Sequence, residues 1–236
     1  MNQPTTRTAR ATAPRRPPLP AFVAPMLAQP GAPFDADDHL FEIKWDGVRM
    51  LAIRDAKGYR LVNRHQAERT AQYPELACLA QLPAGTILDG EMVVLQQGRP
   101  DFGKLLSRDL AGQPIKIHLL ARALPATYVV FDLLYHRYRP LLSEPLHQRR
   151  VQLGELLNAL GQPQVVRSEG IVGAGKEFFR QVCALGLEGV VAKQLDSRYR
   201  PGQRSRAWIK IKPPREIRSA DGTYPPAGSS HLPVSR

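Results

Sequence analysis

Cysteine and long apolar runs are scarce in this chain of 236 residues. Its two cysteines, Cys78 and Cys183, are too few for a disulfide framework or a cysteine-rich zinc module. Both lie in apolar stretches, so we expect buried free thiols in a reducing compartment. No apolar run reaches the length of a membrane helix, and we therefore expect no membrane partner.

Acidic residues are also few, and the chain is strongly basic. Lys and Arg number 33 against 21 Asp and Glu, which gives a formal net charge of +12. Residues 1–20 carry +4 of this charge and residues 213–236 carry +1, which leaves +7 on residues 21–212. A basic globular part of this kind argues against an acidic disordered protein and favours a polyanionic partner.

Composition divides the chain into three parts. Residues 1–20 hold five prolines among Thr, Ala and Arg, and they predict a disordered basic arm. Residues 213–236 are rich in Pro, Gly and Ser and predict a disordered tail. Hydrophobic residues make up 43% of the chain, enough for a core, so we expect one folded domain over 21–212.

Short strands and two helices are expected within this domain. Residues 48–53 and 59–62 flank a D-A-K-G turn and predict a hairpin. Apolar residues share one helical face in 146–160 and again in 178–185. The further predicted strands are 87–95, 128–135, 189–193 and 208–212. Antiparallel strands with peripheral helices are typical of an α+β fold.

The stretch F-E-I-K-W-D-G-V-R at 41–49 places Lys44 in an apolar and aromatic setting. Burial or nearby cations lower the pKa of a lysine and allow its amine to act as a nucleophile. Gly47 permits a tight turn into the next strand. An isolated K-x-D-G is more often a surface ion pair on a hairpin, so this motif requires support from other segments.

Two later strands carry acids in apolar settings. In 87–94, Asp89 and Glu91 lie on one side of the strand, where burial is costly unless the acids bind something. A strand end with a bulge is the structural alternative. Strand 128–135 holds Phe131, which suits either base stacking or a core position.

The last two segments carry groups suited to a metal and a phosphate. Glu188 begins the strand 189–193, where a carboxylate is well placed for a metal ion. Lys210 and Lys212 share one face of strand 208–212, and they repel one another unless an anion lies between them. A solvated edge strand is the alternative explanation.

Taken in order, these five segments resemble the nucleotidyltransferase motifs of the ATP-dependent DNA ligases, whose superfamily includes RNA ligases and mRNA-capping enzymes. The resemblance extends from residue 25 to residue 212 and is closest to the bacterial ligases of end joining. Those ligases show the E-I-K-W-D-G form, a P-D-F element as at 100–102, and a stretch like Y-R-P-G-Q-R-S at 199–205. The resemblance implies an ATP-grasp-like nucleotidyltransferase fold and the use of ATP.

The resemblance also implies roles for the residues that bind the nucleoside. Lys44 looks like the nucleophile that attacks the α-phosphate of ATP and becomes a lysyl-AMP. Glu42 and the backbone of Ile43 would read the adenine edge, and Phe131 would stack on the base. Arg49 would contact ribose, phosphate or the nicked strand.

Further roles concern phosphate and metal. Arg64, like Arg49, would contact ribose, phosphate or the nicked strand, and Glu91 would bind the ribose hydroxyls or assist a metal. Glu188 would help to hold a divalent metal, Mg²⁺ or Mn²⁺, while Lys210 and Lys212 would bind the α-phosphate. Positioning and charge neutralisation are what nucleotidyl transfer requires.

The implied activity is the sealing of nicked double-stranded DNA in repair or recombination. AMP passes from the lysine to a DNA 5′-phosphate, and a 3′-hydroxyl then displaces it. The expected setting is the cytoplasm of a bacterium, on the nucleoid, with a separate OB-fold domain or end-joining proteins as partners. The alternatives are a non-enzymatic nucleic-acid-binding remnant, and an RNA ligase or capping activity of the same superfamily.

Two departures from the family pattern stand out. Residues 63–70 read N-R-H-Q-A-E-R-T, where the family usually has S-R-N-G, so Arg64 is present but the N-G turn is not. Family ligases continue into an OB-fold domain, whereas 24 residues follow Lys212 here. Because a domain needs about 50 residues or more, we expect an adenylation domain without its OB-fold partner and slow self-adenylation.

Overall fold

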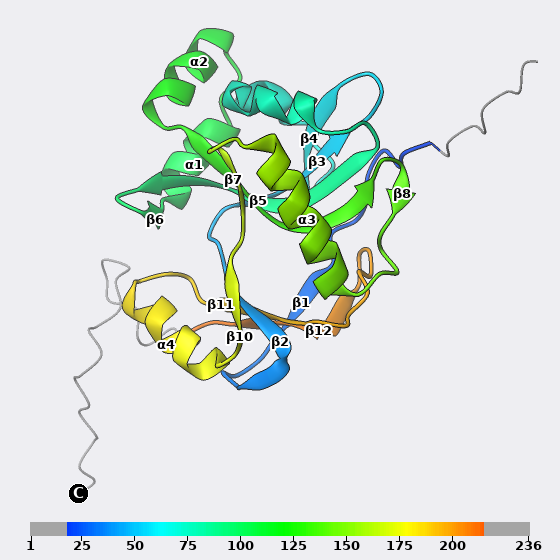
Figure 1. Cartoon of the computed structure of the whole chain (residues 1–236). Coiled ribbons are helices and arrows are strands. Elements are labelled where there is room, and N and C mark those ends of the chain that lie inside the picture. The colour runs from blue at the N-terminus through cyan, green and yellow to red at the C-terminus, as the bar shows by residue number, and fades with distance from the viewer. Residues whose placement is uncertain (1–17, 215–236) are drawn as a thin grey trace, which may run out of the picture.

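The computed structural model describes residues 18–214 (Figure 1). The predicted basic arm and the predicted C-terminal tail lie almost wholly outside the described residues. Two sheets dominate the described part, and their helices lie at the periphery (Figure 1). In this part of the chain, no helix is both long and apolar enough to cross a lipid bilayer.

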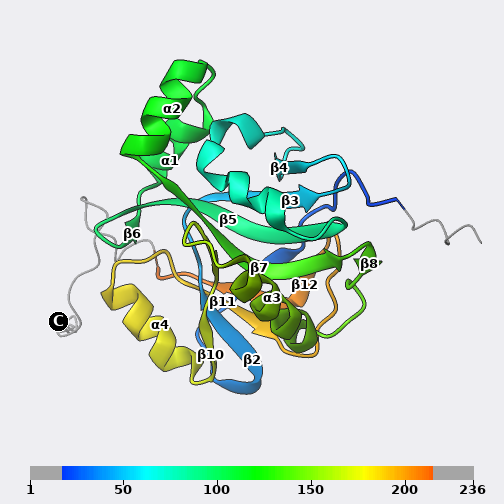
Figure 2. The ribbon, with the colours of Figure 1, turned by 45° about the horizontal axis from the view of Figure 1, so that its top comes forward.

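The first sheet has five strands and brings together segments from both ends of the domain. Its order is β1 (Leu27–Pro30), β12 (Arg204–Ile211), β11 (Val190–Gln194), β2 (Ala36–Ile43) and β10 (Gly170–Gly173). The β1–β12 pair is parallel and the other pairs are antiparallel. Helix α4 (Gly175–Ala184) packs on β2, β10 and β11 (Figure 2).

The second sheet is built from the middle of the chain. Its main order is β4 (Tyr59–Asn63), β3 (Val48–Arg54), β5 (Thr86–Gln96), β7 (Ala126–His136) and β8 (Arg139–Pro140). The short strand β6 (Arg99–Pro100) pairs with β5, and β9 (Val165–Arg167) runs parallel to β7.

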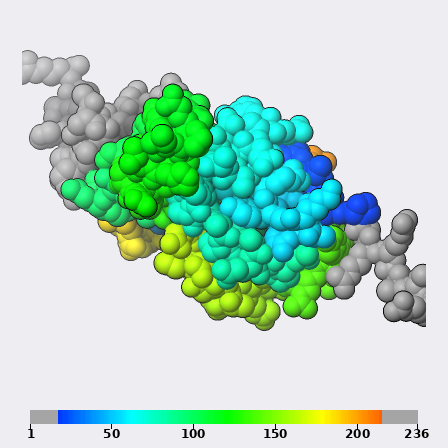
Figure 3. All heavy atoms as spheres, turned by 90° about the horizontal axis from the view of Figure 1, so that it is seen from above, coloured from blue at the N-terminus to red at the C-terminus, as the bar shows by residue number. Residues whose placement is uncertain are grey.

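Helices cover the second sheet on its outer side. Helix α3 (Leu146–Leu160) packs on β7 and β9, and α1 (Phe102–Asp109) packs on β5. Two 3₁₀ helices, Thr70–Gln72 and Pro74–Gln81, and helix α2 (Pro114–Ala123) complete this side. Seen from above, these segments and the neighbouring strands form most of the visible surface (Figure 3).

One apolar cluster joins the two sheets. Met26, Tyr199 and Trp208 of the first sheet and its flanking segments pack with Leu51 and Phe131 of the second sheet. Burial of such side chains is the main favourable contribution to folding. The cluster therefore fixes the sheets against each other along the line where their inner faces meet.

The predicted α+β fold is confirmed. The hairpin is β3 and β4, the four further strands are β5, β7, β11 and β12, and the two helices are α3 and α4. The chain adds two parallel strand pairs to the expected antiparallel sheets. Helices α1 and α2 were not predicted, although Asp101, whose side chain caps α1 by accepting the backbone N–H of Lys104, is a helix-start signal.

The expectation of buried cysteines is wrong. Both Cys78 and Cys183 are free thiols at intermediate exposure, because each lies on a helical segment that only partly faces the core. Their partial burial still raises the pKa of both thiols above the ordinary value.

Candidate active site

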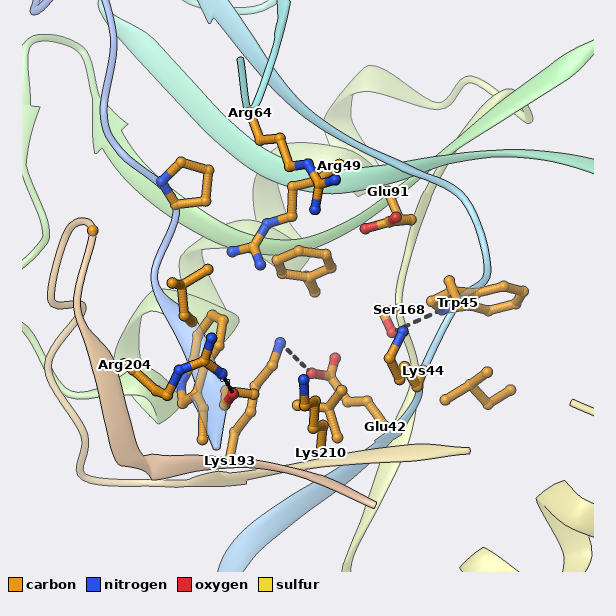
Figure 4. Close-up of a pocket in the computed structure, with 18 of the residues that line it drawn as sticks. Glu42, Lys44, Trp45, Arg49, Arg64, Glu91, Ser168, Lys193, Arg204 and Lys210 are labelled. Carbon is orange, nitrogen blue, oxygen red and sulfur yellow. Dashed lines mark hydrogen bonds and ion pairs between the residues drawn. The ribbon is translucent and has the colours of Figure 1, made fainter. Parts of the chain in front are cut away.

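A pocket of about 630 Å³ lies between the two sheets (Figure 4). The first sheet lines it with residues of β1, β2, β11 and β12, and the second sheet with residues of β3, β5 and β7. Because strand residues alternate in direction, one face of each sheet supplies most of these side chains. The polar side chains that converge here include Glu42, Lys44, Arg49, Arg64, Glu91, Lys193 and Lys210.

Lys44 follows the last residue of β2 and enters the pocket from its edge. Its backbone N–H donates to the carbonyl of Gly189 at 2.8 Å, which fixes the start of the loop. Its Nζ donates to Glu188, whose other oxygen pairs with Lys212. Burial acts to raise the pKa of Glu188, but the hydrogen bonds from Lys212 and Lys44 lower it on balance.

The turn after Lys44 requires glycine because the chain passes very close to β5. A Cβ atom on Gly47 would lie 2.1 Å from the carbonyl oxygen of Met92 and 2.9 Å from the side chain of Glu91. The K-x-D-G turn is thereby held against the strand that carries Glu91. This contact couples the position of the lysine to the opposite wall of the pocket.

Arg49 of β3 is held in the pocket by a buried carboxylate. Its Nε and Nη2 donate to the two oxygens of Asp89 at 2.8 and 2.6 Å. The Tyr199 hydroxyl donates to Asp89 at 2.6 Å and accepts the backbone N–H of Met26 at 2.9 Å. Burial acts to lower the pKa of Arg49, but Asp89 raises it well above the ordinary value, so the guanidinium stays charged.

Glu91 of β5 lies opposite Lys44 and near Arg49. Burial raises the pKa of Glu91 to about 8, although the charges of Arg49 and Lys44 act in the opposite direction. A carboxyl group with this pKa titrates near neutral pH, which is unusual for a structural residue and frequent at functional sites.

Phe131 of β7 contacts two cations. The guanidinium of Arg49 is 4.8 Å from its ring centroid and the Nζ of Lys193 is 4.3 Å from it. Trp208 meets the ring edge-on with centroids 6.2 Å apart. On another wall of the pocket, the indole N–H of Trp45 donates to the Ser168 hydroxyl at 3.3 Å. These rings give the pocket an apolar part beside its charged groups.

The structure gathers the predicted residues in one place. Eight of them line the pocket: Glu42, Ile43, Lys44, Arg49, Arg64, Glu91, Phe131 and Lys210. Glu188 and Lys212 do not line it but adjoin it, because Glu188 pairs with both Lys44 and Lys212. The roles expected for all ten remain predictions.

Several pocket residues were missed from sequence, namely Trp45, Ser168, Lys193, Arg204 and Trp208. Lys193 faces the same way as Val191, two residues earlier on β11, but nothing in the sequence indicated that this face lines the pocket. Ser168 had no local signal, since it precedes β10 in a loop and reaches the site only through the fold.

The carboxylates of the site fit a metal ion held jointly by protein and nucleotide better than one held by protein side chains alone. Among residues 18–214, no group of three or more Asp, Glu, His or Cys side chains is arranged to hold a metal ion. Magnesium is commonly held by one or two carboxylates together with substrate phosphates. Glu91 lines the pocket and Glu188 adjoins it, each as a single carboxylate, so they fit a metal that the nucleotide phosphates help to bind.

Two facing sheets around a lysine-bearing pocket are the architecture of a nucleotidyltransferase domain. Residues 25–212 match the family described as "ATP dependent DNA ligase domain". The chain belongs to this family. Its relatives in the family are ATP-dependent DNA ligase catalytic domains.

Two of the matched relatives come from bacteria. The chain is 33% identical over 192 residues to the SPbeta prophage-derived DNA ligase-like protein LigB of Bacillus subtilis, covering 80% of this chain and 67% of that protein. It is 38% identical over 195 residues to the multifunctional non-homologous end joining DNA repair protein LigD of Mycobacterium tuberculosis, covering 80% of this chain and 24% of that protein.

A solved structure confirms the fold. The ligase domain of M. tuberculosis LigD superposes with a TM-score of 0.68 at 37% identity, covering 80% of this chain and 60% of the solved one. A mycobacterial DNA ligase D complexed with ATP and MES gives a TM-score of 0.67, also at 37% identity. The chain thus spans about a quarter of LigD and 60% of the solved ligase domains.

Proposed function

We propose that residues 21–212 form an adenylation domain that transfers AMP from ATP to Lys44 and then to a DNA 5′-phosphate. The observation that carries this proposal is the position of Lys44 at the edge of a pocket that combines aromatic rings, carboxylates and cationic side chains. The relatives named as DNA ligases, one of them solved with ATP, support the same conclusion.

In the first step the Lys44 amine attacks the α-phosphorus of ATP. A phosphorus–nitrogen bond forms, the bond to the β-phosphate oxygen breaks, and pyrophosphate leaves with the electron pair of that bond. The amine must lose a proton, because an ammonium group has no lone pair. Glu188 contacts this amine, so the ion pair has to loosen when the nucleotide enters.

Other side chains position the nucleotide. Glu42 reads the edge of the adenine, and Phe131 presents a ring face suited to stacking. Lys210 extends into the pocket from β12, where its charge offsets that of the α-phosphate. A divalent metal, when bound, would neutralise phosphate charge from the side of Glu91 and Glu188.

In the second and third steps the domain would act on nicked double-stranded DNA. Arg49 and Arg64 lie at one wall of the pocket and would meet the phosphate of the nicked strand. An OB-fold domain supplied separately, or end-joining proteins, would hold the duplex against this side. Nick sealing measured with and without an added OB-fold domain tests this dependence, and nicked RNA compared with nicked DNA tests the substrate.

Labelled adduct formation tests the first step directly. The chain incubated with α-labelled ATP and Mg²⁺ or Mn²⁺ is expected to retain label on a denaturing gel. Lys44→Ala removes the nucleophile and should abolish the adduct. Lys57→Ala is the matched control, because Lys57 is an exposed lysine in the β3–β4 turn.

The same experiment separates the two classes of function. A wild-type chain that forms no adduct with either metal would overturn the enzymatic proposal. A non-enzymatic DNA-binding remnant would instead show salt-sensitive DNA binding that Lys44→Ala leaves unchanged.

A further inference from the structure

A buried cluster of one carboxylate and two cations lies at the base of the pocket. Glu42 is 1% exposed, and its oxygens pair with Lys193 Nζ at 2.5 Å and with Arg150 Nη1 at 3.0 Å. The three residues come from β2, β11 and α3, so the cluster joins the first sheet to a helix of the second. Figure 4 shows Lys193 reaching Glu42 from the neighbouring strand.

Lys193 has no freedom to leave this position. It is 3% exposed, and its Nζ lies 4.3 Å from the ring centroid of Phe131 and 4.5 Å from that of Trp208. Burial lowers its pKa, and the charge of Glu42 acts in the opposite direction. A long, charged side chain enclosed by two rings has lost most of its rotamer freedom, so it holds its partner at a fixed point.

Arg150 contacts both the Glu42 carboxylate and the backbone of two other pocket residues. Its Nη1 donates to the backbone carbonyl of Phe131 at 3.4 Å, and its Nη2 donates to that of Ser168 at 2.5 Å. Phe131, Ser168 and Glu42 all line the pocket, whereas Arg150 lies behind them. One guanidinium therefore sets the spacing between the stacking ring and the carboxylate.

The carboxylate retains capacity to accept a hydrogen bond. Both oxygens of Glu42 are close to cations, yet neither has a partner with hydrogen-bond geometry. Buried polar atoms are nearly always satisfied in folded proteins. Because Glu42 lines the pocket, a ligand donor is the group that can complete its bonding.

We propose that Lys193 and Arg150 are positioning residues that fix the Glu42 carboxylate as an acceptor for the 6-amino group of a purine. This inference rests on the proposed function, because it concerns the base-reading part of the same pocket. An ionised carboxylate only accepts hydrogen bonds. A purine with an oxygen at position 6 would place that acceptor next to the Glu42 carboxylate, which is also an acceptor, and leave both buried groups without a hydrogen bond. Sites built to hydrogen-bond a substrate group strongly reject ligands that lack it.

Equilibrium binding of nucleoside monophosphates tests the inference without any reaction. The two tryptophans of the chain, Trp45 and Trp208, both line the pocket, so their fluorescence reports binding. The probes are adenosine 5′-monophosphate and inosine 5′-monophosphate, which differ at position 6 and in the proton on the adjacent ring nitrogen. The wild type should bind the adenosine compound at least tenfold more tightly.

Substitutions assign the preference to the cluster. Lys193→Met should reduce the ratio of the two dissociation constants to less than threefold, and Lys193→Arg should retain most of it. Lys193→Gln keeps a hydrogen-bond donor without the charge, and it serves as the second neutral variant if the methionine variant does not fold. Lys210→Met is the matched control, because a phosphate-side lysine should weaken both ligands equally.

The outcomes separate this inference from the proposed function. A Lys193 variant that is folded by thermal unfolding and keeps the wild-type ratio would overturn the positioning role while adenylation stands. A wild-type ratio near one would also overturn it. If the wild type binds neither nucleotide, the proposed function fails, and the inference that depends on it fails with it.

Discussion

At the scale of single residues, the loss of the Asp89 carboxylate should destabilise the fold strongly. It is fully buried and accepts two hydrogen bonds from Arg49 and one from Tyr199. Asp89→Asn removes the charge and leaves a buried guanidinium without its counterion, which costs about 3–5 kcal/mol in comparable pairs. We expect urea denaturation to show a loss of unfolding free energy of about 3 kcal/mol.

An exposed arginine pair provides the control for this prediction. Glu177 and Arg180 pair on the surface of α4, where both side chains are largely in solvent. Glu177→Gln should change the unfolding free energy by less than about 1 kcal/mol. Equal losses of unfolding free energy in Asp89→Asn and Glu177→Gln would show that the buried pair stabilises the fold no more than the exposed pair does.

The raised pKa of Glu91 predicts how the unfolding free energy depends on pH in the absence of divalent metal. Its pKa is raised from 4.5 to about 8 in the folded chain, so the folded state binds more protons than the unfolded state between these values. The unfolding free energy therefore falls as pH rises from 4.5 to 8. Ionisation at this partly exposed site should cost about 2 kcal/mol.

Removal of the carboxyl group checks that assignment. Glu91→Gln is expected to gain about 2 kcal/mol relative to the wild type between pH 5 and pH 9, measured by denaturant unfolding in chelator. If the difference in unfolding free energy between Glu91→Gln and the wild type stays constant with pH, a group other than Glu91 causes the pH dependence.

At the scale of the elements, Gly189 connects the two strands that frame Lys44. It has a φ of 140°, and its carbonyl accepts the Lys44 backbone N–H at 2.8 Å. A Cβ atom there would lie 2.1 Å from the carbonyl oxygen of Ile211. Gly189→Ala should push the start of β11 away from β12 and move Lys44 from its position. Displacements of about 1 Å cost reactions about 100-fold, so we expect a fall in adduct formation of this order.

The β3–β4 turn supplies the control. Gly58 lies in that turn, and a Cβ atom there would meet nothing within 4 Å. Gly58→Ala should leave the rate of adduct formation unchanged, as measured with α-labelled ATP. A Gly189→Ala chain that reacts at the wild-type rate would show that the strand connection does not position the lysine.

The elements also show how far sequence reasoning extends. Alternation of Lys and Ile in 208–212 predicted the C-terminal part of β12, which ends at Ile211, because a strand sets that period locally. The roles of Lys193 and Tyr199 could not be predicted, because their partners Glu42 and Asp89 are more than 100 residues away in the chain. Only the pairing of β11 with β2, and of the first sheet with the second, brings them together.

At the scale of the whole molecule, the two sheets form one cooperative unit that encloses the nucleotide pocket. Phe131 and Leu51 from one sheet share an apolar cluster with Met26, Tyr199 and Trp208 from the other. The Asp89–Tyr199 hydrogen bond adds a polar link across the same junction. Neither sheet can separate without exposing this cluster, so the domain should unfold in one transition.

Binding of AMP should then shift that single transition upward, because the ligand binds only when both sheets are in place. At a concentration 100 times the dissociation constant, the gain is about 2.7 kcal/mol. For a domain of this size, the midpoint of thermal unfolding should rise by about 5–10 °C. Differential scanning calorimetry of the full chain measures this rise in the midpoint with AMP, and the same concentration of inorganic phosphate serves as the control. Two transitions, of which AMP moves only one, would show that the sheets unfold independently and that the pocket belongs to one of them.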